Sequence, residues 1–341
     1  MSGRQFGVSI EGGATLEHEA WLTVNRGPTT FVISISFDDV QNTLWGAEYL
    51  LQPKTHEFNA SNMILTLCMP IIEKLASTSS IQGLRLEALC DSSTHRMRIT
   101  SAGGAQGEDI HVVVDEDTSH RPSHGLLPIP ISELAEFCTG VARISATDVI
   151  LSTADEQLDD HNAEFPHGKA FMLDGTAVYL KASLGHGTQF ERELEILGRI
   201  EQLGLRKRDS NRFSHLIAVV TTGEQNEKVV GMLLELIPTV PYGGDLLHEA
   251  MQARTDMHQK WKSQVLRMVE ELHAHDIVWG DVNAGNVVID NDLNAWAVDF
   301  GGMNNAEFVD DELAETIEGD WQGVHRLFDG WLPSRGPNSQ P

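Results

Sequence analysis

The stretch HDIVWGDVNAGN at residues 275–286, followed by DFG at residues 299–301, decides how the rest of the chain is interpreted. Asp281 is followed five residues later by Asn286 and eighteen residues later (299 − 281) by Asp299. An aspartate beside a γ-phosphate can accept the proton of an attacking hydroxyl, and amide and carboxylate oxygens can hold divalent ions on the phosphates. The spacing therefore predicts a Mg·ATP site with Asp281 as the base and Asn286 and Asp299 as metal ligands.

The residues before Asp299 predict how it returns to this site. Two short apolar runs, residues 286–290 and 295–298, flank the turn residues Asn291 and Asp292. This pattern is typical of an antiparallel hairpin. A hairpin of this length would bring its two ends, and so the two candidate metal ligands, close together.

Charge restricts the classes of partner. The chain has 341 residues, with 24 Lys and Arg against 50 Asp and Glu, and a formal net charge of −26. Nonspecific nucleic-acid binding and docking on an anionic membrane both require clustered Lys and Arg, so neither is expected. One basic cluster, residues 206–208 with Arg212 beyond, is either a nuclear-import signal or a solvated loop after a helix.

Cysteine usage and hydropathy predict an intracellular protein. Cys68, Cys90 and Cys138 are odd in number and widely spaced, which favours reduced thiols and a cytoplasmic location, with the nucleus as an alternative. The first residues lead into no apolar segment typical of a signal peptide. The longest apolar run, residues 63–72, is interrupted by Pro70 and is too short to span a bilayer.

The length predicts about two domains, and the first is expected at residues 1–125 as a small mixed α/β domain of unknown role. Residues 31–37 alternate as a half-buried strand does, and residues 109–114 predict another strand. A helix is expected at residues 63–76, where Pro70 predicts a kink or a break.

The second region has a recognisable order of elements. It contains a strand pair at 170–173 and 177–180, a helix at 190–203, a strand pair at 215–222 and 228–237, and an amphipathic helix at 255–273. Asp174 and Gly175 form the turn of the first pair, and Lys181 ends its second strand. Pro238 and Pro241 mark a crossing between two lobes.

This order, together with the Asp-x-x-x-x-Asn loop and the Asp-Phe-Gly motif, resembles the protein-kinase-like superfamily from about residue 126 to residue 332. The resemblance implies an α+β fold with two lobes, preceded by the mixed α/β N-terminal domain. The implied boundaries are an N-lobe at residues 126–237, a truncated C-lobe at residues 238–333 and a flexible tail at residues 334–341.

The resemblance also implies roles for residues of the N-lobe. Lys181 would pair with the α- and β-phosphates of ATP, and Glu193 on the following helix would hold it there. Glu195 is the alternative partner. The backbone of Glu235 to Ile237 would form the hinge that meets the adenine edge.

Departures from the pattern define the kind of kinase. Trp279-Gly280 replaces the usual His-Arg, so no arginine is available there to read an activation-loop phosphate. The polar stretch before Lys169 lacks a Gly-rich loop. Asn283, expected to line the ATP site, replaces the usual lysine and removes one positive charge near the γ-phosphate. Aminoglycoside- and choline-kinase-like enzymes resemble this sequence in carrying a neutral or His/Gln side chain there.

Two functions are compatible with these features. Residues 299–320 form a short activation segment, and Glu318–Gly323 resembles the start of the helix that anchors the catalytic loop. The first function is an ATP/Mg-dependent phosphotransferase that transfers the γ-phosphate to a hydroxyl of a protein or small molecule. The alternative is a pseudokinase that acts as a binding or scaffolding module and uses residues 1–125 to engage a partner.

Overall fold

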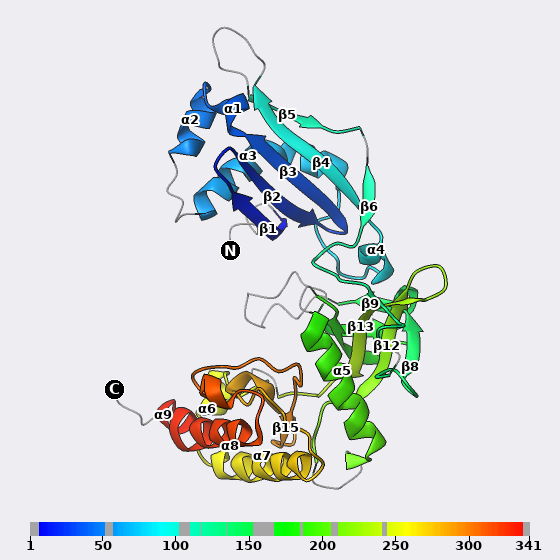
Figure 1. The fold of residues 1–341 in the computed structure, drawn as a ribbon, viewed down its shortest axis with the longest axis vertical. Coiled ribbons are helices and arrows are strands. Elements are labelled where there is room, and N and C mark those ends of the chain that lie inside the picture. Colours follow the sequence, from blue (N-terminus) through cyan, green and yellow to red (C-terminus); the bar gives the residue numbers. More distant parts are fainter. Residues whose placement is uncertain are drawn as a thin grey trace. The chain divides into compact units, whose positions relative to one another are not determined.

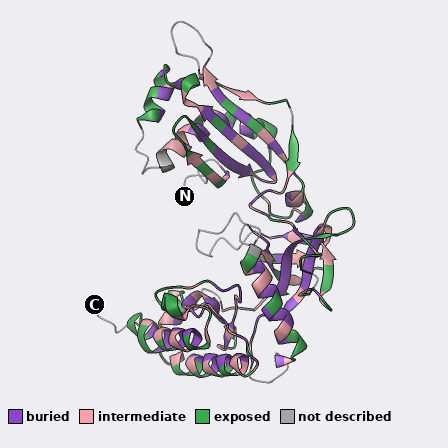
Figure 2. Cartoon of the chain, viewed as in Figure 1, coloured by how far each residue is buried: buried purple, intermediate pink, exposed green. Residues whose placement is uncertain are grey.

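The computed structural model describes residues 7–51, 57–101, 110–116, 118–134, 136–152, 167–184, 187–205, 211–240 and 244–336. The chain divides into two compact units (Figure 1). One comprises Met1–Pro128 with Ala146–Gly175, and the other comprises Ile129–Ser145 with Thr176–Pro341. Each unit has its own core of buried side chains (Figure 2). Across the residues described, no helix combines the length and the apolar character needed to cross a membrane. The basic cluster at residues 206–208 lies outside the described residues.

Ala146–Gly175 was expected in the second domain, but the structure groups it with the first unit. Within this segment, β9 (Val149–Leu151) pairs antiparallel with β10 (Gly168–Met172). The amide of Leu86 donates to the carbonyl of Val149 at 2.9 Å. Main-chain bonds between residues so distant in sequence leave no local signal. Strands β9 and β10 also continue the sheet that contains β11 (Ala177–Ala182), in the order β8-β12-β13-β11-β10-β9. Most of the polar stretch before Lys169, residues 153–166, lies outside the described residues.

The first unit is built on a sheet in the order β1-β2-β3-β4-β5, with β6 paired to β4. Its elements are β1 (Ser9–Thr15), β2 (Glu19–Arg26), β3 (Thr29–Ser36), α1 (Phe37–Val40), α2 (Leu44–Leu50), α3 (Glu57–Leu75), α4 (Glu87–Cys90), β4 (Ser92–Ser101), β5 (Ile110–Val114), β6 (Ser119–Arg121) and the 3-10 turn η2 (Ala146–Asp148). Strands β3 and β4 are parallel, and the other pairings are antiparallel. The alternation expected at residues 31–37 is confirmed, because Phe31, Ile33 and Ile35 are all buried.

Helix α3 differs from its prediction. It begins at Glu57, earlier than expected, and runs without a break through Pro70 to Leu75. Proline inside a helix costs about 3 kcal/mol because it removes a hydrogen bond and crowds the preceding turn. Here Leu65 and Ile72 are completely buried against the sheet residues of the core. Burial of such side chains contributes about 1.5–3 kcal/mol each, so packing outweighs the local penalty.

The first unit also contains a buried histidine, His124. Its protonation makes the free energy of unfolding depend on pH, which can be tested. His124 is 4% exposed, and its Nδ1 lies 3.1 Å from Ser123 Oγ. Burial lowers the pKa of His124 from 6.5 to about 4. Folding therefore favours the neutral ring. The stability that depends on this is fully present above the unfolded pKa and is lost as pH falls toward 4.

We expect the wild type to lose about 2 kcal/mol more unfolding free energy than His124→Asn between about pH 7 and about pH 5. Asparagine is suitable because His124 has a φ of 57°, and Asn tolerates this left-handed region. Urea unfolding of the full chain at the two pH values measures the difference. Equal losses in both proteins would show that His124 is not the titrating group.

The second unit combines a mainly antiparallel sheet with a helix packed on it. Its sheet elements are β7 (Ile129–Pro130), β8 (Ala142–Ser145), β11 (Ala177–Ala182), β12 (Leu216–Thr222) and β13 (Lys228–Glu235), and α5 (Gly187–Gln202) follows β11. Strand β13 is central: it pairs antiparallel with β11, β12 and β7. Strand β8 pairs parallel with β12. Leu194 and Leu197 of α5 are buried with these strands, which confirms the expected helix.

The rest of the second unit is mainly helical. Its elements are α6 (Glu249–Gln252), α7 (His258–His273), η4 (Ala284–Asn286), β14 (Val287–Ile289), β15 (Ala295–Ala297), η5 (Asp311–Leu313), α8 (Ile317–His325), the π-helical segment η6 (Arg326–Trp331) and α9 (Leu332–Ser334). The apolar stripe predicted for α7 is confirmed, since Trp261, Val265, Met268, Val269 and Leu272 are all completely buried. Together the two units make an α+β protein.

The hairpin predicted before Asp299 is also present. Strands β14 and β15 pair antiparallel, with Val287 opposite Ala297. The amide of Val298 then donates to the carbonyl of Asn286 at 3.1 Å. The hairpin therefore places Asp299 one residue beyond a direct main-chain contact with Asn286.

Candidate functional site

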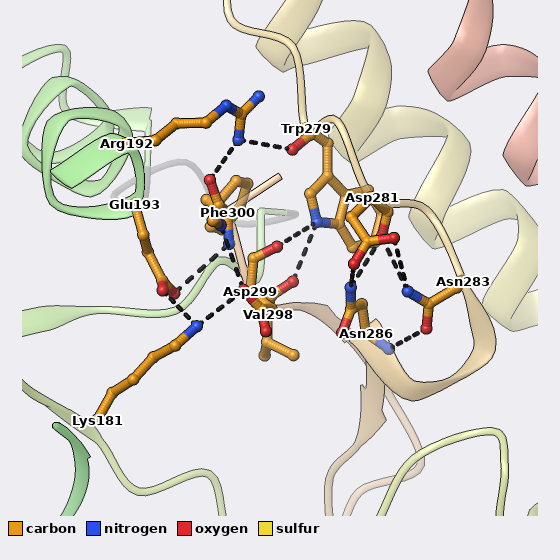
Figure 3. A network of polar contacts seen from close by, with 11 residues as sticks. Lys181, Arg192, Glu193, Trp279, Asp281, Asn283, Asn286, Val298, Asp299 and Phe300 are labelled. Carbon is orange, nitrogen blue, oxygen red and sulfur yellow. Dashed lines mark hydrogen bonds and ion pairs between the residues drawn. The ribbon is translucent and has the colours of Figure 1, made fainter. Parts of the chain in front are cut away.

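Three charged side chains that are distant in sequence meet at one point of the second unit (Figure 3). Lys181 at the end of β11 forms an ion pair with Glu193 of α5. The same ammonium lies 2.8 Å from Asp299 Oδ1. Burial alone would lower the pKa of Lys181, but the two carboxylates outweigh it and raise the pKa above its ordinary value. The lysine is therefore a permanent cation between two carboxylates.

The structure distinguishes between the two glutamates considered for this pair. Glu193 is 1% exposed and faces Lys181, whereas Glu195, two residues further along α5, is exposed to solvent. Successive residues of a helix point about 100° apart, so residues i and i+2 lie on different faces. Glu193 therefore holds the lysine, as the sequence analysis preferred.

The Asp-Phe-Gly motif is anchored through its middle residue. Phe300 is completely buried between Phe213 and Trp279, at ring-centroid distances of 6.3 and 6.1 Å. Its amide donates to Glu193 Oε1 at 3.4 Å. Asp299 has a φ of 57°, a left-handed conformation that Asp tolerates better than most residues. Burial of the phenylalanine thus turns the aspartate carboxylate toward Lys181.

Asp281 is held by two amides of its own loop (Figure 3). Asn283 Nδ2 donates to Asp281 Oδ1 at 2.9 Å, and Asn286 Nδ2 donates to Asp281 Oδ2 at 2.8 Å. Asn283 Oδ1 accepts the amides of Gly285 and Asn286 at 2.8 and 3.2 Å. The asparagines therefore fix the orientation of the carboxylate as well as the path of the loop.

The protonation of Asp281 is shifted toward neutrality. Burial raises the pKa of Asp281 to about 6, with a further contribution from the negative charges of Asp299 and Glu315. The hydrogen bonds from Asn283 and Asn286 act in the opposite direction. A carboxyl with this pKa is a better proton acceptor near neutral pH than an ordinary aspartate, because its conjugate acid is weaker.

A third aspartate, Asp320 in the first turn of α8, accepts hydrogen bonds from the backbone just before Asp281. It is 2% exposed. Its Oδ2 accepts the amide of Trp279 and Oδ1 accepts the amide of Gly280, both at 2.8 Å. His273 Nε2 lies 2.8 Å from Oδ2. The start of this helix was predicted from the sequence. A role for Asp320 was not, because a single acidic residue in a first helical turn is a common feature.

Arg192 was not identified from the sequence. It lies next to Glu193 on α5, and its guanidinium donates to the carbonyls of Val278, Trp279 and Phe300. It also forms an ion pair of 2.6 Å with Glu315. The sequence shows only one more charged residue on an amphipathic helix. Its carbonyl partners lie 86 to 108 residues further along the chain, so no local pattern predicts them.

The expected adenine hinge receives less support from the geometry. Glu235 is the last residue of β13, and its amide donates to the carbonyl of His215 at 2.9 Å. This amide is therefore engaged within the sheet, and the hinge role of the backbone from Glu235 to Ile237 stays a prediction. Ile237, half-buried, follows the strand before Pro238. Pro241, the second residue used to mark the crossing between lobes, lies outside the described residues.

Asn286 and Asp299 have the donor chemistry that a magnesium ion requires. Mg²⁺ prefers hard oxygen ligands and is usually held by one or two protein groups together with phosphate oxygens. The Nδ2 of Asn286 faces Asp281, which turns its carbonyl oxygen away from that carboxylate. The Asp299 carboxylate is 42% exposed, so it is accessible from solvent. The residues present therefore fit a Mg·nucleotide complex.

Comparison with protein-family models and with the sequences of curated proteins finds no match for this chain. The geometry of the site is therefore the basis for its function.

Proposed function

We propose that the second unit is an ATP/Mg-dependent phosphotransferase with a two-lobed, protein-kinase-like fold. The observation that carries the proposal is the contact of Lys181 with both Glu193 and Asp299, across 118 residues of sequence between lysine and aspartate. A partly buried cation between one buried and one partly exposed carboxylate suits a nucleotide site. The cation can serve the phosphates, and the exposed carboxylate can serve a metal.

Each residue has a separate task in this proposal. Lys181, oriented by Glu193, binds the α- and β-phosphates. Asn286 and Asp299 hold Mg²⁺, which neutralises charge on the phosphates when bound. Asp281 orients the acceptor hydroxyl and accepts its proton. Catalysis then depends mainly on positioning and on charge neutralisation.

The arrangement of elements supports the two-lobed fold. The sheet that carries Lys181 and α5 would be the N-lobe, and the part containing α7, β14, β15 and α8 would be the truncated C-lobe. Ile317, the first residue of α8, follows Asp299 by only eighteen residues (317 − 299). So short a segment offers little platform for an extended peptide. The acceptor is accordingly a hydroxyl of a small molecule, or of a protein held elsewhere on the chain.

Paired variants of α5 test the nucleotide site. We expect Glu193→Gln to weaken Mg·ATP binding by about tenfold, the equivalent of losing one charge-assisted hydrogen bond that orients Lys181. Glu195→Gln, the matched control, removes the same charge from an exposed position and should bind as the wild type does. Isothermal titration with Mg·ATP measures both.

The outcomes separate the proposal from its failure. Wild-type protein that binds no ATP at millimolar nucleotide and Mg²⁺ would rule out the proposed function. Equal affinities in Glu193→Gln and Glu195→Gln would instead show that the nucleotide binds elsewhere.

One observation favours a second function, a pseudokinase that binds nucleotide without transfer. The Asn283 side chain is fully engaged within its loop, with Nδ2 on Asp281 and Oδ1 on two amides. A neutral, internally bonded amide offers no positive charge to a departing phosphoryl group. In that case Mg·ATP would bind, but no phosphate transfer or hydrolysis would depend on Asp281.

A further inference from the structure

We propose that Arg192 and Glu315 form a permanent ion pair that positions the catalytic loop and the Asp-Phe-Gly motif, so that the site is assembled without phosphorylation of the chain. The inference rests on the proposed function, because it assigns a positioning role within the same site. Its structural content can nevertheless be tested without catalysis.

Arg192 contacts the backbone beside two parts of the site. Nη1 donates to the carbonyls of Trp279 and Phe300, while Nη2 donates to the carbonyl of Val278 at 3.1 Å and pairs with Glu315 Oε2. Two nitrogens of a guanidinium carry four hydrogens, and four acceptors are present. The arginine therefore links α5 to the residues just before Asp281 and to the residue just after Asp299.

The neighbouring residue gives this link its significance. Glu193, next to Arg192 on α5, holds Lys181 and accepts the amide of Phe300. Two consecutive residues of one helix thus orient the phosphate-binding lysine and the catalytic loop. A displacement of α5 would disturb both at once.

Glycines leave the space that this pair occupies. Gly280 has a φ of 86°, and a Cβ there would lie 2.5 Å from Arg192 Nη2 and 2.9 Å from Glu315 Oε2. Gly302 has a φ of 76°, and a Cβ there would overlap Glu315 Oε1. Any larger side chain at either position would displace the ion pair. In the resemblance, position 280 is an arginine that binds a phosphate of the activation loop. Here the position is Gly280, and the guanidinium of Arg192 from α5 occupies the space that a side chain at this position would take.

Glu315 is presented by a constrained backbone. It has a φ of 58° and directly precedes the N-cap of α8. The cap residue, Thr316, accepts the amide of Gly319 at 3.0 Å and donates its hydroxyl to the carbonyl of Leu313 at 2.7 Å. The carboxylate is therefore held in front of Arg192 by the start of a helix, and it carries a negative charge without any modification.

The experiment compares Glu315→Gln with Glu312→Gln in protein shown by mass to be unphosphorylated. Both variants remove one negative charge, but Glu312 is exposed and lies three residues earlier. We expect hydrogen exchange in segments 278–281 and 299–302 of the nucleotide-free protein to be about fivefold faster in Glu315→Gln only, because a partly exposed ion pair contributes modestly. We expect kcat to fall by about fivefold in the same variant, with the Kd for Mg·ATP within about twofold of wild type.

The results separate this inference from the proposed function. Exchange rates in Glu315→Gln equal to those of Glu312→Gln would overturn the positioning role, whether or not the wild type transfers phosphate. Wild-type turnover that appears only after phosphorylation by another kinase would overturn the claim that the site is permanently assembled. Faster exchange in Glu315→Gln together with an inactive wild type would preserve the positioning role and reject the enzyme.

Discussion

Asp281→Asn is expected to reduce kcat by about a hundred- to ten-thousandfold, the range typical of losing a general base. Asp281 is the residue to which the proposal assigns proton acceptance beside the acceptor hydroxyl. Burial has already raised the pKa of this aspartate to about 6. Asparagine has the same shape but cannot accept the proton. Phosphate transfer or ATP hydrolysis under saturating Mg·ATP measures the effect.

A matched control lies in the same loop. Asp276 is exposed and has a φ of 54°, a conformation that asparagine also adopts readily. Asp276→Asn changes the same chemical group five residues earlier and should keep wild-type kcat. Equal turnover in wild type and Asp281→Asn would mean that Asp281 is not the base. Mg·ATP binding without turnover in the wild type would favour the pseudokinase.

Local periodicity was sufficient for the elements that carry the site. The strands β12 and β13, the stripe of α7 and the hairpin before Asp299 are all confirmed. Helix α7 buries one face, whereas β12 and β13 are buried along most of their length. Such patterns report which side of a strand or helix faces a core. The break that was one of the two expectations at Pro70 does not occur in α3. The penalty of proline is local, whereas the compensating packing against a sheet involves residues distant in sequence.

The site residues also divide into those that the sequence predicts and those that it does not. Asp281, Asn286 and Asp299 were predicted because their spacing follows a chemical requirement, and Lys181 was predicted from the resemblance in the order of elements. Arg192 and Asp320 act through main-chain groups far along the chain, and Glu315 acts through Arg192. Any charged surface residue has the same appearance in the sequence. The pairing of the Glu235 amide with His215 is likewise a contact between distant residues that the sequence does not show.

Asp299→Asn is expected to abolish the Mg²⁺-dependent part of ATP binding. Wild-type protein should be stabilised by about 2.7 kcal/mol when Mg·ATP is present at a hundred times its Kd, because the ligand binds only the folded state. In the variant, thermal unfolding with ATP should be the same with Mg²⁺ as with a chelator. Asparagine preserves the left-handed backbone at φ 57°, so the loss would reflect the missing charge on the metal and on Lys181 and not a change of fold.

The hairpin that delivers Asp299 also provides the control. Asp292→Asn, in the exposed turn between β14 and β15, removes the same charge at a distance from the metal ligands and should retain the Mg²⁺-dependent stabilisation. If Asp299→Asn kept that stabilisation as well, the metal would be bound by other groups. The carboxylate would then serve only to orient Lys181.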